Sequence, residues 1–568
     1  MRNRVLSGCA ALCALAAAAH AQNPAALPIP HLEKRGAATQ LIVDGKPFLA
    51  LSGEVDNTAS SSLEYMEAVW PKLVKVNLNT VLIGVGWDWV EPEEGNYDFT
   101  LVDGLLEGAR KHNLHVVFLW FGSWKNGLSS FAPDWVKANQ QRFPRMRLSN
   151  GKSVEVLTTL SEANLQADSR AYTAFMHHLR EVDSTRRTVV MIQLENEVGL
   201  IGDSRDHSPA AEAAFAASVP AGLLDYLQKN KTTLWPDLRK LWESAGARAA
   251  GTWQQVFGTS TATDEIFMAW TYSRFMDHMA KAGKAEYPLP VFTNSWLVQP
   301  QDQAPGDYPS GCPEPLTIDI WKAGAPAIDL NTPDVHLRNF PDWTERFHRP
   351  NNPLFVPESY GDLGGAANAF FGIGHHASIG YSPFGVNNPE HWAELRPGGN
   401  APVSAAIEDV PLAKAYGVLA QMTPLIVEAQ SKGTIDAAWL NTQLPKRDIA
   451  LGDYVVNLDL QRNRRNPVPA LGYAIVIAAG PDEFFVAGRD VQVIFTPNTP
   501  GPEIAGLARV ETGKFVDGRW IPGRKVNGDD VVLEWDQAAA AAKNQSGSGL
   551  IFGGDGPTIQ HVKLYRYR

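Results

Sequence analysis

The segment Thr188–Gly199, TVVMIQLENEVG, joins an apolar run to two glutamates that are separated by one asparagine. Val189–Ile192 has the apolar, partly β-branched composition of a short strand buried on both faces. Because burying an unpaired carboxylate costs free energy, the glutamates that end this run are either paired structural groups or reagents delivered to a site. The segment therefore predicts a core strand with functional groups at its carboxyl end.

Similar apolar runs recur from about Lys46 and alternate with longer amphipathic segments. The predicted strands are Pro47–Val55, Thr80–Pro92, His115–Lys125, Thr188–Gly199, Leu289–Trp296, Ala327–His336, Pro353–Tyr360 and Ala377–Gly385. Strands buried on both faces and separated by helices imply a parallel sheet, and eight of them predict a (β/α)8 barrel. We expect an α/β fold, a TIM barrel over residues 22–432, with a helical, Trp-rich insertion at Ser204–Phe267 and a closing helix at Pro411–Gln430.

The pattern changes after Lys432. Short runs such as VVNLDL, GYAIVIAAG and DVVLEW alternate apolar and polar residues and are joined by Gly, Asp, Asn and Pro. Alternation at this spacing predicts a smaller all-β sandwich domain over residues 433–568. Its residues fit a cover for the barrel flank, a contact with a partner subunit or a polysaccharide-binding module equally well.

The N-terminus has the features of a secretory signal peptide. Arg2 and Arg4 precede the apolar run VLSGCAALCALAAAA, and Ala19–Ala21 forms a small-x-small cleavage site. We expect residues 1–21 to be removed and the protein to be exported to the periplasm or the medium. A lipoprotein box at Leu6–Cys9 is less favoured, because almost no apolar run precedes Cys9. No other segment has the roughly 20 apolar residues that a membrane span needs.

Composition limits the partners. The 568 residues are 44% hydrophobic and 20% charged, as in a globular protein of two or more domains. The net charge of −11 argues against nucleic acid and anionic membranes as partners.

Of the three cysteines, Cys9 and Cys13 belong to the predicted leader, so Cys312 alone remains and no internal disulfide is expected.

Two predicted strands end in carboxylates that could act together. Glu197 ends the fourth strand and Glu358 the seventh, and both fall at the carboxyl ends of barrel strands, where active sites form. Glu195 lies one layer deeper on the same face as Glu197 and is interpreted as a structural group paired with a base. Paired carboxyl groups are the equipment of glycoside hydrolysis, with retention at a separation of roughly 5–5.5 Å and inversion at roughly 6.5–9.5 Å.

The motif QLENEVG resembles the acid/base motif of family 35 glycoside hydrolases, and more loosely family 42, within the retaining clan A of (β/α)8 enzymes. The upstream stretch NLNTVLIGVGWDWVEPEEGNYDF is similar to the signature that precedes this motif in the family. The resemblance spans Pro47–Gly385. It implies that Asn196 binds the sugar 2-hydroxyl, that Glu197 is the acid/base and that Glu358 is the nucleophile of a double displacement.

Two departures from the family pattern bear on the sugar. The first strand continues as SGEVDNTAS and the third ends in FGSWKNG, which resembles a bacterial branch that has an extra C-terminal β-domain and includes β-galactosidases acting on xyloglucan side chains. That similarity implies sugar contacts from Trp124, Lys125 and Asn126. Further candidates, each as readily explained by packing or by a plain loop position, are Glu91, Trp296, His336, Tyr360 and Tyr381.

The resemblance implies a retaining exo-β-galactosidase that releases terminal β-linked galactose from plant oligosaccharides, and the signal peptide predicts that it is exported. Another retaining exo-β-glycosidase, taking fucose, glucose or arabinose, and a catalytically inert carbohydrate-binding protein are the alternatives. No cofactor or metal is expected, because His177–His178 and His375–His376 lack the spacing of a metal site such as HExxH. A homodimer is left open.

Overall fold

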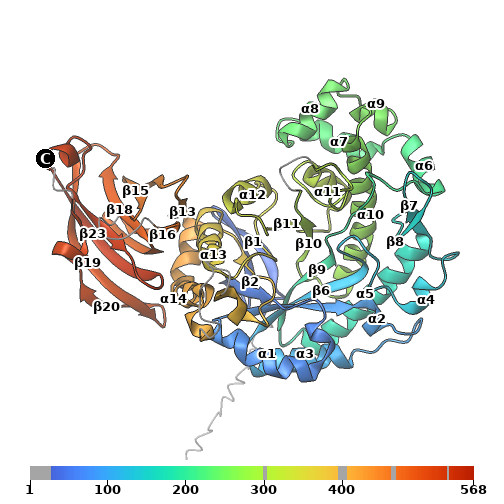
Figure 1. The fold of residues 1–568 in the computed structure, drawn as a ribbon, viewed down its shortest axis with the longest axis horizontal. Helices are drawn as coiled ribbons and strands as arrows, with labels where there is room; N and C mark the ends of the chain where they lie inside the picture. The colour runs from blue at the N-terminus through green and yellow to red at the C-terminus, as the bar shows by residue number, and fades with distance from the viewer. Residues whose placement is uncertain (1–26, 299–302, 394–405, 462–468, 534–536) are drawn as a thin grey trace, which may run out of the picture.

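The computed structural model describes residues 27–298, 303–393, 406–461, 469–533 and 537–568. The predicted signal peptide lies outside the described residues. The chain forms an α/β part and an all-β part that lie side by side along the long axis of the molecule (Figure 1). Within the described ranges, no helix is both long and apolar enough to cross a membrane.

A curled parallel sheet forms the centre of the α/β part. Its strand order is β11-β10-β9-β6-β5-β4-β12. The strands are β4 (Ala50–Glu54), β5 (Thr80–Gly86), β6 (His115–Lys125), β9 (Val189–Asn196), β10 (Val291–Trp296), β11 (Leu330–Asp334) and β12 (Gly380–Tyr381). Every residue of β9 is buried, as its apolar sequence predicts. This arrangement is compatible with a TIM-like barrel.

The prediction of a seventh regular strand at Pro353–Tyr360 is wrong. This segment instead makes isolated parallel bridges, Asp334 with Glu358 on the β11 side and Val356 with Tyr381 on the β12 side. The physical reason is its two prolines, Pro353 and Pro357, because proline has no N–H to donate to a strand ladder. The segment therefore contacts both edge strands of the sheet without forming a continuous strand between them.

Helices cover the outside of this sheet (Figure 1). They are α1 (Leu63–Lys75), α3 (Thr100–Lys111), α5 (Glu162–Asp183), α10 (Thr261–Glu286), α11 (Ile318–Gly324), α12 (Phe340–Phe347), α13 (Leu363–His375) and α14 (Pro411–Lys432), with the short α2 (Trp87–Val90) and α4 (Asp134–Lys137). The predicted insertion is helical and holds α6 (Pro209–Ala216), α7 (Ala221–Lys229), α8 (Pro236–Ser244) and α9 (Trp253–Phe257). Small antiparallel sheets are made by β1 (His31–Arg35), β2 (Ala38–Val43) and β3 (Lys46–Phe48), and by β7 (Arg145–Arg147) and β8 (Ser153–Leu157).

The all-β part is a sandwich of two antiparallel sheets, in the orders β13-β16-β17-β23-β19-β20 and β14-β15-β18-β22-β21. The strands are β13 (Ile435–Asn441), β14 (Lys446–Leu451), β15 (Tyr454–Leu460), β16 (Leu471–Gly480), β17 (Glu483–Arg489), β18 (Val491–Pro497), β19 (Ile504–Val516), β20 (Arg519–Lys525), β21 (Val532–Leu533), β22 (Ser548–Phe552) and β23 (Thr558–Tyr567). Alternate residues such as Val456 and Val493 fill the core between the sheets. The all-β structure predicted from the sequence is therefore confirmed.

The sandwich packs against α13 and α14 of the α/β part. Gly433, with a left-handed φ of 68°, ends α14 immediately before β13. Across the contact, Trp439 donates its indole N–H to Asn368 at 3.1 Å, and the rings of Phe370 and Tyr473 lie 4.8 Å apart. The sandwich thus covers one flank of the helical layer, while the division of the chain into two domains at this point stays a prediction.

Candidate active site

Three carboxyl groups converge at the carboxyl ends of the sheet strands. Glu197 follows β9, Asp334 ends β11, and Glu358 lies in the segment that bridges β11 and β12. One oxygen atom from each lies within 4.8 Å of the others. Their exposed fractions are 7%, 3% and 6%. The two glutamates chosen from the sequence are therefore brought together, and a third carboxyl group joins them.

The backbone around Glu197 is unusual. Glu195 and Glu197 have φ values of 57° and 45°, in the left-handed region that few non-glycine residues adopt. Backbone strain of this kind persists only where surrounding contacts hold it. One such contact is the Glu197 N–H, which donates to the side-chain oxygen of Asn294 on β10 at 2.9 Å. The strand end is thus fixed in the conformation that turns Glu197 toward Glu358.

The two glutamates have opposite proton affinities. Burial, together with the nearby charge of Glu358, raises the pKa of Glu197 to about 7. Burial alone would also raise the pKa of Glu358, but a hydrogen bond from His336 and the charge of Lys125 outweigh it and lower that pKa below its ordinary value. The His336 Nε2 and the Asn196 Nδ2 each lie 3.3 Å from a Glu358 oxygen. At neutral pH, one carboxyl group is therefore ionised while its neighbour holds a proton for much of the time.

Lys125 and two asparagines form a polar chain beside Glu358. The Lys125 ammonium donates to the side-chain oxygens of Asn196 at 2.8 Å and Asn126 at 2.6 Å. Because the Asn196 oxygen is occupied by Lys125, its NH2 group is directed at Glu358. Three of the sugar-binding candidates chosen from the sequence thus lie in the site.

Sequence reasoning missed two acidic residues. Burial, then the charge of Glu358, raises the pKa of Asp334 well above its usual range, and Asn294 donates to Asp334 at 2.6 Å. The same two causes raise the pKa of Glu54, whose carboxyl oxygens have no hydrogen-bond partner among the described residues. Both residues end sheet strands, β11 and β4, so the rule that identified Glu197 could have found them.

Trp124 is in the core rather than in the site. Its side chain is fully buried, its indole N–H donates to the Leu157 carbonyl at 3.0 Å, and its ring packs edge-on against Tyr272 and Phe275 on α10. These contacts assign it to packing between the sheet and α10 and correct the interpretation of Trp124 as a sugar contact.

Glu91 and Tyr381 also have structural roles. The oxygens of Glu91 accept hydrogen bonds from the Trp87 indole at 2.8 Å and from the Gly95 N–H at 2.7 Å, which organises the loop after α2. The buried Tyr381 hydroxyl donates to the Tyr360 carbonyl at 2.8 Å. Because these polar atoms are already bonded within the fold, neither residue is retained as a sugar-binding candidate.

Three remaining candidates lie at more accessible positions. Trp296, the last residue of β10, is 38% exposed. The rings of His336 and Tyr360 meet edge to face with centroids 5.8 Å apart, and the Tyr360 hydroxyl donates to the His336 carbonyl. Tyr360 is half-buried, and the Arg338 guanidinium lies over its ring, 4.6 Å from the ring centroid.

The expectation that Glu195 pairs with a base is wrong. Its carboxyl oxygens accept hydrogen bonds from three consecutive backbone N–H groups, those of Gly122 at 3.2 Å, Ser123 at 3.0 Å and Trp124 at 2.8 Å. Its side-chain neighbour is Asp168 of α5, a second buried carboxyl group. Burial raises the pKa of both groups, so the pair retains a proton between them.

This carboxyl pair occupies a break in the sheet. The register between β6 and β9 shifts between Trp120 and Lys125, which leaves the intervening N–H groups outside the ladder. Glu195 and Asp168 accept from those groups instead. The pair therefore fixes the irregular end of β6 from which Lys125 reaches Asn196.

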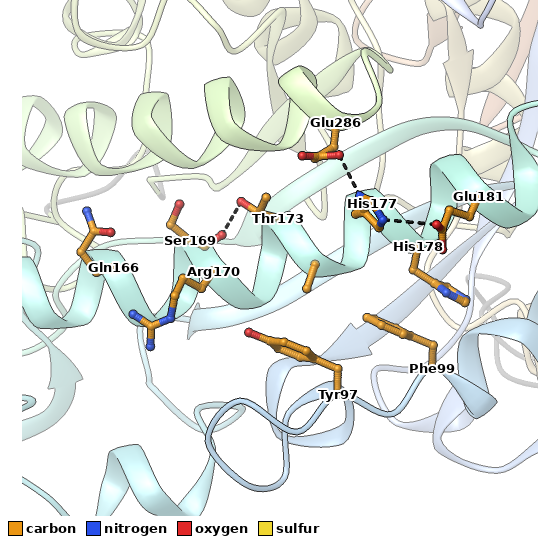
Figure 2. A pocket seen from close by; sticks show the side chains of 11 residues that line it. Tyr97, Phe99, Gln166, Ser169, Arg170, Thr173, His177, His178, Glu181 and Glu286 are labelled. Atoms are coloured by element: carbon orange, nitrogen blue, oxygen red, sulfur yellow. Dashed lines mark hydrogen bonds and ion pairs between the residues drawn. The ribbon is translucent and has the colours of Figure 1, made fainter.

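A separate groove lies on the outer face of α5, between that helix and the Tyr97–Phe99 segment (Figure 2). His177 and His178 line it and point to different partners, Glu286 at 2.9 Å and Asp103 at 2.8 Å. The groove includes none of the converging carboxyl groups, so it is not part of the candidate site.

Comparisons with known proteins point to glycoside hydrolases. Residues 61–287 match a family model described as Beta-galactosidase, of glycoside hydrolase family 42, and residues 412–536 match one described as Domain of unknown function (DUF5597). The closer resemblance to family 35 stays a prediction. A curated relative, the exo-beta-D-glucosaminidase of Pyrococcus horikoshii, is 38% identical over 84 residues, which are 13% of this chain and 10% of that relative. The match thus spans about a tenth of the relative's length.

Solved structures give a more distant likeness. The β-galactosidases of the psychrophilic Marinomonas ef1 and of Bacillus circulans sp. alkalophilus are 12% and 13% identical, with TM-scores of 0.42 and 0.43. Each comparison covers 67% of this chain, and 60% and 57% of the respective solved chains. An exo-beta-1,4-mannosidase from an Opitutaceae bacterium is 14% identical over 62% of this chain and 54% of its own, with a TM-score of 0.35. The family match supports a glycosidase, whereas these structural likenesses are too distant to bear on activity.

We expect Glu195→Ala to destabilise the fold by about 1–3 kcal/mol for each N–H group left unsatisfied, because the oxygen that accepts from the buried Gly122 and Trp124 N–H groups is lost. The measurement is the free energy of unfolding from urea denaturation. Glu181→Ala, the same change at an exposed position on α5, is the matched control. Equal stabilities for the two variants would contradict the role given to the buried pair.

Proposed function

We propose that this chain is a retaining exo-β-galactosidase that releases terminal β-linked galactose from plant oligosaccharides, xyloglucan side chains among them. The observation that carries the proposal is the convergence of Glu197 and Glu358 with opposite pKa shifts. Carboxyl oxygens within 4.8 Å suit the roughly 5–5.5 Å separation of retaining pairs better than the roughly 6.5–9.5 Å of inverting pairs.

In the first step, the ionised Glu358 attacks the anomeric carbon and forms a covalent glycosyl-enzyme. The bond from that carbon to the glycosidic oxygen breaks, and Glu197 gives its proton to the departing oxygen. The split in proton affinity supplies both groups in the required state at the start of the reaction.

In the second step, Glu197 acts as a base. Once Glu358 is esterified, it no longer carries the negative charge that helps to raise the pKa of Glu197. Glu197 then takes a proton from water, whose oxygen attacks the anomeric carbon and releases Glu358 as a carboxylate. The two displacements together retain the configuration at that carbon.

Neighbouring residues would position the sugar. We assign the contact with the 2-hydroxyl to Asn196, which lies 3.3 Å from the nucleophile and is held by Lys125. His336 holds the nucleophile in its ionised form. Trp296, which is 38% exposed, has the ring surface on which the apolar face of a pyranose can stack.

The proposal also assigns a role to each part of the chain. Residues 1–21 direct export to the periplasm or the medium, residues 22–432 form the catalytic domain, and residues 433–568 form a sandwich domain. The contacts of Trp439 and Tyr473 with α13 support a role for the sandwich as a structural cover.

A second candidate activity is removal of terminal β-linked glucosamine, the activity named for the curated relative. It is favoured by the surplus of acidic groups in the site, where Glu54 and Asp334 lie beside the two reacting glutamates and Lys125 is the neighbouring cation. A substrate ammonium group could pair with the Glu54 oxygens, which lack a hydrogen-bond partner within the described part of the chain.

The proposed function is tested with a panel of aryl β-glycosides of galactose, glucose, fucose, arabinose and glucosamine. We expect the highest kcat/KM for the galactoside. A preference for the glucosaminide would replace the proposal with the second candidate, and sugar binding without any hydrolysis would indicate an inert carbohydrate-binding protein.

Glu197→Gln should slow the cleavage of unactivated oligosaccharides by about 10²–10⁴-fold, because their leaving oxygen needs a proton. Activated aryl glycosides, whose leaving groups depart without protonation, should be affected far less in the first step. The measurement is kcat/KM for both substrate types, with the exposed Glu107→Gln on α3 as control. Equal losses on both substrates would remove the acid/base role from Glu197.

The pH profile of kcat/KM should be bell-shaped. The rate should fall as pH rises through about 7, because Glu197 loses the proton that it must donate. The rate should also decrease as the pH is lowered below the ordinary carboxyl pKa, because Glu358 becomes protonated there. His336→Ala should move this acid limb to higher pH, since the hydrogen bond that lowers the pKa of Glu358 is lost. A rate that stays level from pH 6 to pH 9 would be inconsistent with these assignments.

A further inference from the structure

A cluster of histidines lies outside the proposed reaction. His348 follows α12, His375 ends α13 and His376 follows it, next to the sandwich. The ring centroids of His375 and His376 are 4.6 Å apart, and those of His348 and His376 are 5.0 Å apart. Because α13 leads into the start of β12, the cluster lies away from the carboxyl ends of the strands that carry Glu197.

Ligand atoms of this cluster converge on one carboxylate. The Glu345 Oε2 lies 3.8 Å from the Nε2 of His375 and 3.8 Å from the Nε2 of His376, and a ligand atom from each of the three residues lies within 4.8 Å of the others. We propose that Glu345, His375 and His376 bind a divalent transition-metal ion, with zinc as the ion that this donor set favours. Two imidazole nitrogens and one carboxylate oxygen are ligands that zinc takes at about 2.0–2.2 Å, with water in the fourth position.

The other ring nitrogens of both histidines are oriented as metal ligands require. A histidine that binds a metal through one nitrogen usually donates the other N–H to a fixed acceptor. The Nδ1 of His375 lies 2.7 Å from Asp436 on β13, and the Nδ1 of His376 lies 3.1 Å from the Nδ1 of His348. Protons on these Nδ1 atoms leave a lone pair on each Nε2 atom, 3.8 Å from the Glu345 Oε2.

A polar group on α12 already lies beside the proposed ligand atom of His376. The Thr344 hydroxyl, 3.0 Å from the His376 Nε2, is the group that the ion would displace.

Arg447 competes for His375. One guanidinium nitrogen lies 2.8 Å from the His375 Nδ1 and 3.3 Å from the His375 Nε2, and it can donate to either ring nitrogen only when that nitrogen carries no proton. An ion bound at Nε2 must therefore displace Arg447 from that atom. An ion on Nε2 keeps the proton on Nδ1, which selects the bond to Asp436 and leaves Arg447 to pair with Asp436, 3.6 Å away. The negative charges of Glu345 and Asp436 offset two of the three positive charges carried by a divalent ion and Arg447.

The site is accessible. A pocket lined by Lys34, His348, His375 and His376, among others, opens beside it. The Glu345 side chain is 73% exposed, so it can move the short distance needed to close on the ion. Since Asp436 belongs to the sandwich and the ligands to α12 and α13, a bound ion would strengthen the contact between the two parts of the molecule.

The full, untagged chain is first freed of metal with a chelator and then titrated with zinc. Calorimetry measures the binding, and elemental analysis measures the zinc content of the protein. We expect one zinc ion per chain and a Tm that rises with zinc concentration. Glu345→Gln and His375→Gln should each weaken zinc binding at least tenfold. Asp436→Asn, which removes the acceptor of the His375 N–H, should weaken it by about 10–100-fold.

Matched variants separate this site from others. His177→Gln, which removes a half-exposed histidine beside Glu181 and Glu286 on α5, should leave zinc binding unchanged. Glu358→Gln should also leave zinc binding unchanged. A loss of zinc binding in this variant would place the ion among the carboxyl groups of the candidate active site. Circular dichroism checks that each variant is folded. Absence of zinc uptake, or wild-type affinity in folded Glu345→Gln and His375→Gln, would overturn the proposal.

Discussion

The main physical constraint on this structure is the burial of several carboxyl groups around the ammonium group of Lys125 in the candidate active site. Glu54, Glu197, Asp334 and Glu358 are almost fully shielded from water. The charge of the nearby Lys125 favours the ionised forms of the three glutamates. Like charges this close in a medium of low dielectric constant cannot all ionise. Some of these carboxyl groups must therefore stay protonated, and hydrogen bonds determine which of them is ionised.

The hydrogen bonds that decide this converge on Glu358. His336 and Asn196 donate to it, and Lys125 holds Asn196 in the orientation that makes the donation possible. Glu197 instead shares a side-chain hydrogen bond with Asp334 and keeps its proton to about neutral pH. An acid and a nucleophile are thus made from two identical side chains by their surroundings alone, which is the arrangement a double displacement requires.

Beneath this site, a second pair of carboxyl groups has a purely structural purpose. Glu195 and Asp168 accept the N–H groups that the irregular end of β6 withdraws from the sheet, and the left-handed backbone at Glu195 and Glu197 is held in the same region. A break in a parallel sheet would otherwise leave buried donors unpaired, at a cost of about 1–3 kcal/mol each. The irregularity is what allows Lys125 to turn toward Asn196.

By itself, the sequence determined the alternation of buried strands and helices, the all-β texture after Lys432, and the positions of Glu197 and Glu358 after apolar runs, because these features follow from local periodicity and composition. It did not reveal that Pro353 and Pro357 keep their segment from forming a regular strand, that Trp124 packs against α10, or that Glu195 pairs with Asp168 rather than with a base. Nor did it single out Glu54 and Asp334. Only the tertiary structure decided these points, because the direction of a side chain and the partners of a buried charge depend on residues that are far apart in the chain.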